Sequence, residues 1–220
     1  MMKAVFLDFY GTVVHEDGEV IRQITELIYD TGQVADKSEI GTFWWNEFQT
    51  MYMNAYGDQF ETQRILEQRS LEKTLERFHS SADPAELSNR MFEHWRKPPI
   101  FQDAAEFFRT CPVPIYIVSN IDTEDIEKAI AFHDLHPAGV YTSEDAKSYK
   151  PRKELFEYAL LHTGYQKEEV VHIGDSLSSD VEGAKAVGIR AIWLNRSSRA
   201  VPDGVVSIGS LAEVAATALI

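Results

Sequence analysis

The stretch KAVFLDFYGT, residues 3–12, decides the fold that we predict for this chain. Its four consecutive apolar residues, Ala4 to Leu7, are typical of a strand buried on both faces of a sheet. The strand ends at a carboxylate, Asp8, and a glycine three residues later permits a sharp turn. Because ligands of open parallel sheets bind beyond the carboxyl ends of the strands, Asp8 is a candidate for chemistry if this strand is central.

The composition indicates a globular protein with an acidic surface. The chain has 220 residues, 44% of them hydrophobic, which suits one large domain or a core domain with a smaller insert. A formal net charge of −14 repels phosphate backbones and anionic lipids, so we expect neither a nucleic-acid nor a membrane partner. The single cysteine, Cys111, excludes an intramolecular disulfide, and no membrane-spanning run or signal-peptide pattern occurs. We therefore expect a cytoplasmic protein.

Residues from about Glu19 to Trp95 carry apolar side chains at helical spacing and no strand pattern. Four segments share this spacing, and their apolar residues include Ile24, Ile28, Trp44, Phe48, Leu71, Leu75, Leu87 and Met91. In the fourth segment, Asp83 is the expected N-cap and Pro84 the expected first helical residue. We predict a bundle of about four helices.

The sequence Lys97-Pro98-Pro99 is the clearest boundary in the chain, because successive prolines end a helix and stiffen the connection. Strands then alternate with helices. The predicted strands are 113–118, 139–142, 170–174, 190–194 and, less distinctly, 205–208. Helices are predicted at 102–110 and 210–219. Three more lie between them: the first has Asp122 and Asp125 as a capping box, the second begins at Pro151, and the third has Ser179 and Glu182 as a capping box.

This alternation predicts an α/β fold: a doubly wound parallel sheet, with the helical bundle inserted after the first strand. The predicted domains are an α/β core, formed by residues 1–16 plus 98–220, and a helical cap, residues 17–97.

Polar residues follow three of the predicted buried strands: Asp8, Ser119 and Asp175. Lys150 and Asp180 lie near predicted helix starts, and a cation there faces the positive end of the helix dipole unless anions surround it. Carboxylates about 4 Å apart repel by roughly 4 kcal/mol per pair at an effective dielectric of ~20, more than one lysine can offset. Mg²⁺, which binds carboxylates, carbonyls and waters, is therefore the expected cofactor.

Four segments resemble, in order and spacing, the motifs of the haloacid dehalogenase (HAD) superfamily. They are DFYGT at 8–12, SN at 119–120, KP at 150–151 and GDSLSSD at 174–180. The resemblance covers essentially the whole chain, with the helical insert in the place of the family's α-helical cap. It implies a Rossmann-like core and an enzyme that acts on a small molecule, with the cap closing over the site and setting specificity.

The resemblance also implies a role for each motif residue. Asp8 would be the nucleophile that forms an aspartyl intermediate, supported by Thr12, and Lys150 would orient it and neutralise the transferred charge. Ser119 and the backbone amide of Asn120 would bind a phosphoryl oxygen. Mg²⁺ would be held by Asp8, the Tyr10 backbone carbonyl and Asp175, with Asp180 close by, directly or through water.

The first and fourth motifs point to different branches of the family. Phosphatases of the family carry, where this chain has Tyr10, a second aspartate that protonates the leaving group and then activates water. A phenol with a pKa near 10 can donate a proton but is a poor base at neutral pH. Dehalogenases have tyrosine there but do not need metal, usually lack the first acid of the fourth motif, and use a cap arginine. This chain keeps Asp175 and Asp180, and residues 42–63 contain no Arg or Lys, so Arg64 is the nearest candidate.

We therefore predict a Mg²⁺-dependent hydrolase, a phosphatase of a small phosphorylated metabolite. The alternatives are a 2-haloacid dehalogenase or other carbon-centred hydrolase, which Tyr10 favours, and a catalytically weak ligand-binding or regulatory member. A phosphonate-cleaving enzyme would need a cap lysine for a Schiff base, for which Lys37 and Lys73 are the candidates.

Overall fold

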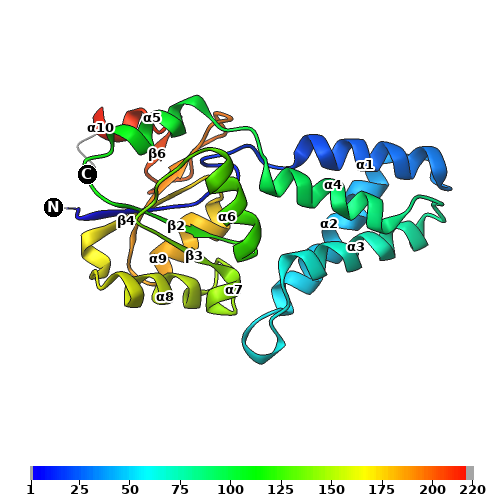
Figure 1. Ribbon diagram of the computed structural model, residues 1–220, viewed down its shortest axis with the longest axis horizontal. Coiled ribbons are helices and arrows are strands. Elements are labelled where there is room, and N and C mark those ends of the chain that lie inside the picture. Colours follow the sequence, from blue (N-terminus) through cyan, green and yellow to red (C-terminus); the bar gives the residue numbers. More distant parts are fainter. Residues whose placement is uncertain (1, 217–220) are drawn as a thin grey trace.

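The computed structural model describes residues 2–216, which form an α/β part and a four-helix segment beside it (Figure 1). The six strands make one all-parallel sheet in the order β3-β2-β1-β4-β5-β6. The strands are β1 (Ala4–Leu7), β2 (Ile115–Ser119), β3 (Gly139–Thr142), β4 (Val170–Gly174), β5 (Arg190–Leu194) and β6 (Ser207–Ile208). The first strand of the chain is thus a central strand of the sheet, and the predicted doubly wound parallel fold is confirmed.

The register of the central strands sets which residues meet at the sheet edge. Leu7 of β1 pairs with Ile117 of β2 and Ile173 of β4, and the Asp8 backbone amide donates to the Ile173 carbonyl at 2.9 Å. Parallel strands end on the same side, so the residues that follow β1, β2 and β4 converge there.

Helices cover both faces of the sheet (Figure 1). The helices of this part are α5 (Gln102–Thr110), α6 (Thr123–Phe132), α7 (Ser143–Ala146), α8 (Lys153–Thr163), α9 (Gly183–Ala186) and α10 (Glu213–Ala216), with 3-10 turn η2 (Lys167–Glu169) and π-helix η3 (Leu177–Glu182). Alternate residues of β1 point to opposite sides: Val5 and Leu7 join the cluster under α5 and α6, and Ala4 and Phe6 join the one under α8 and α9. Burial of both faces explains why the strands are continuous apolar runs.

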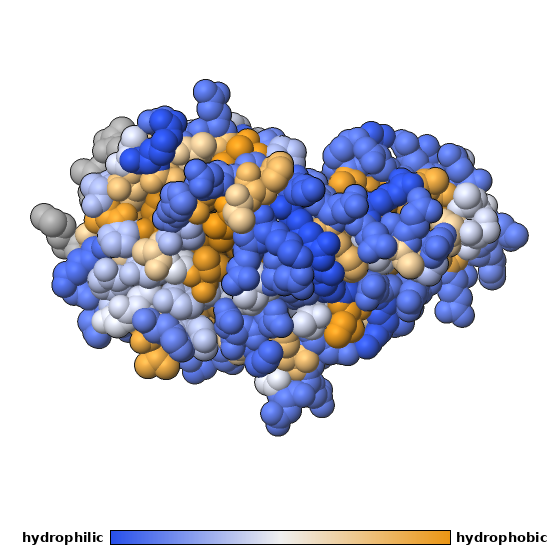
Figure 2. Space-filling view, in the orientation of Figure 1, coloured by the Kyte–Doolittle hydropathy of each residue, from blue (hydrophilic) through white to orange (hydrophobic). Residues whose placement is uncertain are grey.

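The four-helix segment consists of α1 (Gly18–Thr31), α2 (Lys37–Asn54), α3 (Gln63–Arg77) and α4 (Pro84–Arg96), with 3-10 turn η1 (Gly57–Gln59) between α2 and α3. Asp83 caps α4 and Pro84 is its first residue, as predicted. The segment lies beyond the carboxyl ends of the strands, and its visible face is mostly hydrophilic (Figures 1 and 2). Its two connections to the sheet run side by side: the Phe101 amide donates to the Val13 carbonyl at 3.0 Å, and the His15 amide to the Pro99 carbonyl at 2.8 Å.

Several local predictions were wrong in their bounds. Strand β2 begins at Ile115, since prolines at 112 and 114 lack the amide that a ladder needs. Helix α8 begins at Lys153, after a turn in which the Arg152 amide donates to the Tyr149 carbonyl. The sixth strand has two residues, and the last helix is described as Glu213–Ala216, with positions 217–219 of the prediction outside the described residues.

The two predicted capping boxes were also wrong. Ser176 rather than Ser179 caps the π-helix η3, with its hydroxyl accepting from the Ser179 amide at 3.1 Å. Asp122 precedes α6, but its side chain does not cap that helix. Among the described helices, none combines the length and apolarity that a bilayer span requires.

Candidate active site

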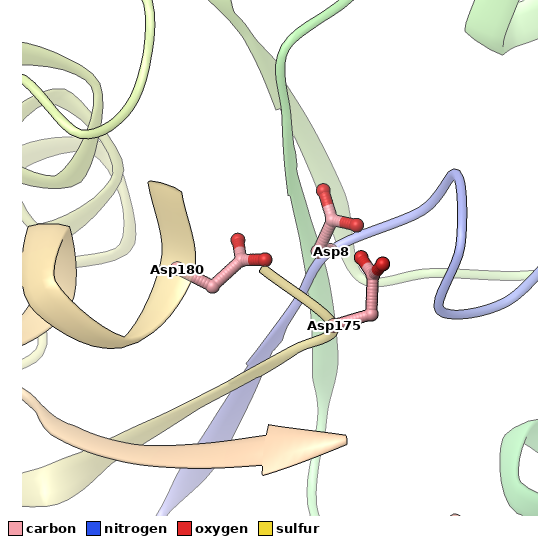
Figure 3. Close-up of side chains that lie close together, drawn as sticks. All are labelled: Asp8, Asp175 and Asp180. Carbon is pink, nitrogen blue, oxygen red and sulfur yellow. The ribbon is translucent and has the colours of Figure 1, made fainter. Parts of the chain in front are cut away.

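Three carboxylates meet at the carboxyl edge of the sheet. Asp8 follows β1, Asp175 follows β4 and Asp180 lies in η3. One oxygen of each lies within 4.8 Å of the others, and Figure 3 shows the three side chains gathered around one space. Strands far apart in the chain thus bring together the acidic residues that the sequence singled out.

Lys150 lies among these carboxylates and is 1% exposed. Its Nζ donates to Asp8 Oδ1 at 2.7 Å, to Asp180 Oδ1 at 2.6 Å and to the Val118 carbonyl at 2.9 Å. Burial alone would lower the pKa of Lys150, but the Asp180 and Asp8 carboxylates outweigh burial and raise that pKa above its ordinary value. The lysine is therefore an ammonium ion that fixes the position of Asp8.

Asp180 accepts more hydrogen bonds than its neighbours. Besides Lys150, it accepts from His172 Nε2 at 2.9 Å and from the Ser176 amide at 3.0 Å. Burial opposes ionisation, but Lys150 and His172 hold the pKa of Asp180 well below its ordinary value. His172 is a fully buried residue of β4 to which the sequence assigned no role, although a histidine inside a buried apolar strand is a visible signal.

Asp175 is in the opposite electrostatic situation. Burial, together with the Asp8 and Asp180 carboxylates, raises the pKa of Asp175 to about 8. Thr12 Oγ1 is its hydrogen-bond donor at 3.5 Å, the limit for such a bond. Gly11 makes room for this side chain, because a Cβ there would lie 2.6 Å from the Asp175 carboxyl carbon, and its φ of +86° suits glycine.

These features fit a hard divalent cation. The donor atoms are carboxylate oxygens, the type that Mg²⁺ prefers, and they lie close enough to share one ion. Three carboxylates face a single ammonium group, that of Lys150, so the lysine does not balance the negative charge of the cluster. Positive charge placed between Asp8 and Asp175 would remove that imbalance.

The motif at the end of β2, Ser119 and Asn120, lies against the same carboxylates. Ser119 Oγ donates to Asp8 Oδ1 at 3.4 Å, and Ser119 is buried. The Asn120 side chain holds the backbone of Lys150: its Oδ1 accepts from the Lys150 amide at 2.7 Å and its Nδ2 donates to the Lys150 carbonyl at 3.0 Å. Tyr52 of α2 donates to that same carbonyl at 2.5 Å and accepts from Asn120 Nδ2. The four-helix segment is thus tied directly to the lysine.

Tyr10, two residues after Asp8, contacts the four-helix segment. Its hydroxyl donates to the Trp95 carbonyl at the end of α4, at 2.6 Å. Burial, reinforced by the Asp125, Asp17 and Asp8 carboxylates, raises the pKa of Tyr10 well above its ordinary value. The phenol is therefore a protonated hydrogen-bond donor whose proton already has an acceptor.

Asp122 and Asp125, expected as cap residues of α6, instead hold the four-helix segment. The Asp122 carboxylate accepts from the backbone amides of Gln63 and Arg64, at 2.7 and 3.0 Å, and so caps α3. Asp125, fully buried, accepts from Arg64 Nε at 2.6 Å and from Arg96 Nε at 3.0 Å. Gln63 and Arg64 precede these aspartates by about sixty residues, and Arg96 precedes Asp125 by about thirty. Local sequence patterns therefore do not reveal these contacts.

A cavity of about 600 Å³ lies between the four-helix segment and the sheet edge. Its walls include all the sequence-predicted site residues except Thr12, namely Asp8, Tyr10, Ser119, Asn120, Lys150, Asp175 and Asp180. Aromatic side chains of the helices form much of the opposite wall, among them Trp44, Trp45, Phe48, Tyr52 and Trp95. The basic residues that the sequence offered as substrate-binding groups of the helical segment, Arg64, Lys37 and Lys73, do not line this cavity. Arg64 is paired with Asp125 and packs over the Phe92 ring, Lys73 is paired with Glu47, and Lys37 packs over the Tyr29 ring.

Residues 2–188 match the haloacid dehalogenase-like hydrolases. The chain belongs to this family of hydrolases. A phosphoserine phosphatase of Thermus thermophilus is 30% identical over 141 residues, which cover 59% of this chain and 55% of the relative. The (S)-2-haloacid dehalogenase 4A of Burkholderia cepacia is 24% identical over 206 residues, which cover 89% of this chain and 84% of that dehalogenase.

Solved structures of this HAD hydrolase family share the fold over nearly the full length. The putative HAD-hydrolase YfnB from Bacillus subtilis, determined bound to magnesium, has a TM-score of 0.78 at 19% identity and covers 100% of this chain, which covers 99% of it. At this identity the likeness shows the fold alone. The chain spans about half the length of the first curated relatives it matches, 55% and 51%.

Proposed function

We propose that this HAD hydrolase is a Mg²⁺-dependent phosphatase of a small phosphorylated metabolite, with Asp8 as its nucleophile. The observation that carries the proposal is the buried cluster of Asp8, Asp175 and Asp180, whose carboxylates share the single ammonium group of Lys150. An anionic phosphoryl group can approach such a cluster only if further positive charge is present. The similarity to a phosphoserine phosphatase and the fold shared with a magnesium-bound hydrolase support this choice.

Mg²⁺ would be held by the carboxylates of Asp8 and Asp175 and by the Tyr10 backbone carbonyl, with Asp180 close by, directly or through water. When bound, it supplies the positive charge that draws the substrate phosphoryl group to Asp8 and stabilises charge on its oxygens. Asp180 keeps Lys150 in place, because the two form a buried ion pair at 2.6 Å.

In the proposed reaction the Asp8 carboxylate attacks phosphorus, the bond from phosphorus to the leaving oxygen breaks, and an aspartyl phosphate forms. Water then attacks the phosphorus, which releases phosphate and restores the Asp8 carboxylate. Ser119, the Asn120 backbone amide and Lys150 donate hydrogen bonds to the phosphoryl oxygens. Lys150 also keeps the Asp8 carboxylate oriented through its 2.7 Å hydrogen bond.

Acid–base assistance is the weak part of this site. Tyr10 cannot serve as a base at neutral pH, since its pKa is raised, and its hydroxyl donates to the Trp95 carbonyl. We therefore propose that turnover is fastest with esters whose leaving group needs little protonation, such as p-nitrophenyl phosphate.

The test is phosphate release from a panel of phosphate monoesters, with and without Mg²⁺. We expect activity that EDTA abolishes, that Mg²⁺ restores, and that Asp8→Asn lowers by at least about a thousandfold. Asp134→Asn, at an exposed loop position, is the matched control for the loss of one carboxylate. Activity that survives either EDTA or Asp8→Asn would refute the proposal.

A 2-haloacid dehalogenase is the second candidate. Tyr10 and the alignment with a haloacid dehalogenase over 84% of its length favour it. Against it, Lys150 is the only cationic side chain in the described cavity wall, and Lys150 is already paired with two carboxylates. Halide release from 2-chloropropionate in the presence of EDTA would promote this candidate over the phosphatase.

A further inference from the structure

Glu67 is a buried carboxyl group on the wall of the active-site cavity, and none of the motifs accounts for it. It is 6% exposed, and its Oε1 is buried without a hydrogen-bond partner. Burial, with a contribution from Asp17, raises the pKa of Glu67 to about 8. Most buried polar atoms in native proteins are paired, because leaving one unpaired costs free energy. Because the Glu67 side chain also lines the cavity, its carboxyl group can pair with a group of a bound ligand.

The position of Glu67 matches the organic part of a substrate better than its phosphoryl group. Helix α3 is fixed to the sheet edge where the Gln63 amide donates to Asp122. Glu67 lies one turn further along this helix, which is about 6 Å at a rise of ~1.5 Å per residue. Asp8 and Glu67 line the same cavity of about 600 Å³, so one ligand can place its phosphoryl group at Asp8 and another group at Glu67.

The surroundings of Glu67 suit a cation. Trp44 and Trp95 line the same cavity, and their indole nitrogens already donate, to Ser70 at 3.2 Å and to Asp17 at 3.3 Å. Glu16 and Asp17 add further carboxylates to the wall. Aromatic rings combined with carboxylates are the usual environment for binding an ammonium group, whereas a carboxylate ligand would be repelled here.

We propose that Glu67 selects the substrate by accepting a hydrogen bond from a protonated amine on the leaving group. The preferred substrates are then monophosphate esters of small amino alcohols that carry no carboxylate. That these esters are hydrolysed rests on the proposed phosphatase function, but the binding of the amine does not. An ammonium group beside Glu67 favours its ionised form, so binding produces a charge-assisted pair.

The first test compares phosphoethanolamine with propyl phosphate, which replaces the ammonium group by a methyl group of similar size, and with 2-phosphoglycolate, which carries a carboxylate. We expect kcat/KM for phosphoethanolamine to exceed that for propyl phosphate at least about tenfold, the effect of one charge-assisted hydrogen bond. Phosphoglycolate is expected to be the poorest of the three. A ratio near one, or a preference for phosphoglycolate, would overturn the proposal.

The variant Glu67→Gln keeps the shape of the side chain and removes its charge. We expect it to lower the phosphoethanolamine to propyl phosphate ratio at least about tenfold, mainly through KM. Glu76→Gln removes a charge from an exposed position of the same helix and is expected to leave the ratio unchanged. An unchanged ratio in Glu67→Gln would overturn the proposal, as would an equal loss in Glu76→Gln.

A binding measurement separates this inference from the proposed function. Tryptophan fluorescence, with Trp44 and Trp95 in the cavity wall, can follow titration with 3-aminopropylphosphonate and with butylphosphonate, neither of which is hydrolysed. Tighter binding of the aminophosphonate, lost in Glu67→Gln, supports the inference even if the protein hydrolyses no ester. Ester hydrolysis with equal binding of the two phosphonates would overturn the inference and leave the phosphatase proposal standing.

Discussion

Replacing Glu67 by glutamine should make the ligand-free protein more resistant to rising pH. The ordinary pKa of this carboxyl is 4.5, and burial with the nearby Asp17 raises it to about 8 in the folded protein. Between these two values the folded protein holds a proton that the unfolded chain has lost. Glu67 therefore contributes fully to stability below its unfolded pKa, and that contribution is lost as pH rises through the folded pKa.

The magnitude follows from the shift. Within this window the free energy of unfolding falls by about 1.4 kcal/mol per pH unit, and the fall from pH ~5.5 to ~7.5 is about 2.5 kcal/mol. Glutamine has no such proton, so its advantage over glutamate grows by that amount across the same range. The cost of burying the amide shifts the whole Glu67→Gln curve but not its slope.

The assay is urea unfolding of wild type, Glu67→Gln and the exposed-site control Glu76→Gln, in EDTA and at several pH values. We expect the difference in unfolding free energy between Glu67→Gln and wild type to rise steadily with pH, and the Glu76→Gln curve to run parallel to wild type. Parallel curves for Glu67→Gln and wild type would refute the reasoning, because they would mean that Glu67 is ionised in the folded protein at neutral pH.

Three further outcomes are expected at the sheet edge. Lys150→Met should destabilise the protein by about 3–5 kcal/mol in urea unfolding, since it leaves Asp8 and Asp180 as buried charges without their partner; an unchanged midpoint would contradict the buried ion pairs. Mg²⁺ should raise the thermal unfolding midpoint more at pH ~8.5 than at pH ~6, because the Asp175 carboxyl, with a pKa of about 8, is protonated at the lower pH and binds metal less well. The variant Asp175→Asn should remove this pH dependence. Tyr10→Asp should accelerate hydrolysis of alkyl phosphates at least about tenfold relative to p-nitrophenyl phosphate, and an unchanged ratio would show that the wild-type site has no deficit in leaving-group protonation.

The sheet edge could be predicted from the sequence because its information is local. Buried apolar runs mark β1, β2 and β4, and each run is followed by a polar residue, Asp8, Ser119 or Asp175. Parallel pairing then places these residues on one side without further assumptions. Lys150 could be assigned to the same site because a lysine near the start of a helix faces the positive end of the helix dipole and is stabilised there only by nearby anions.

The contacts between the helices and the sheet could not be predicted in the same way. Asp122 has the local sequence of an N-cap, but its acceptor capacity is used by the amides of Gln63 and Arg64, which are distant in the chain. Glu67 was missed for a different reason. The apolar spacing identified α3, but its buried stripe also contains Glu67 and Ser70, and a count of apolar residues passes over polar ones.

The loop after β2 connects chemistry with recognition. Ser119 ends β2 and contacts Asp8, and Asn120 begins the loop and holds the backbone of Lys150. Asp122, two residues further, accepts from backbone amides in the first turn of α3, the helix that carries Glu67. One short segment thus contacts both the proposed phosphoryl site and the helix of the proposed amine site, so we expect the two sites to keep a fixed separation. A substrate is then selected by its length as well as by its charge, and esters with a longer spacer between phosphate and amine should lose the preference that Glu67 provides.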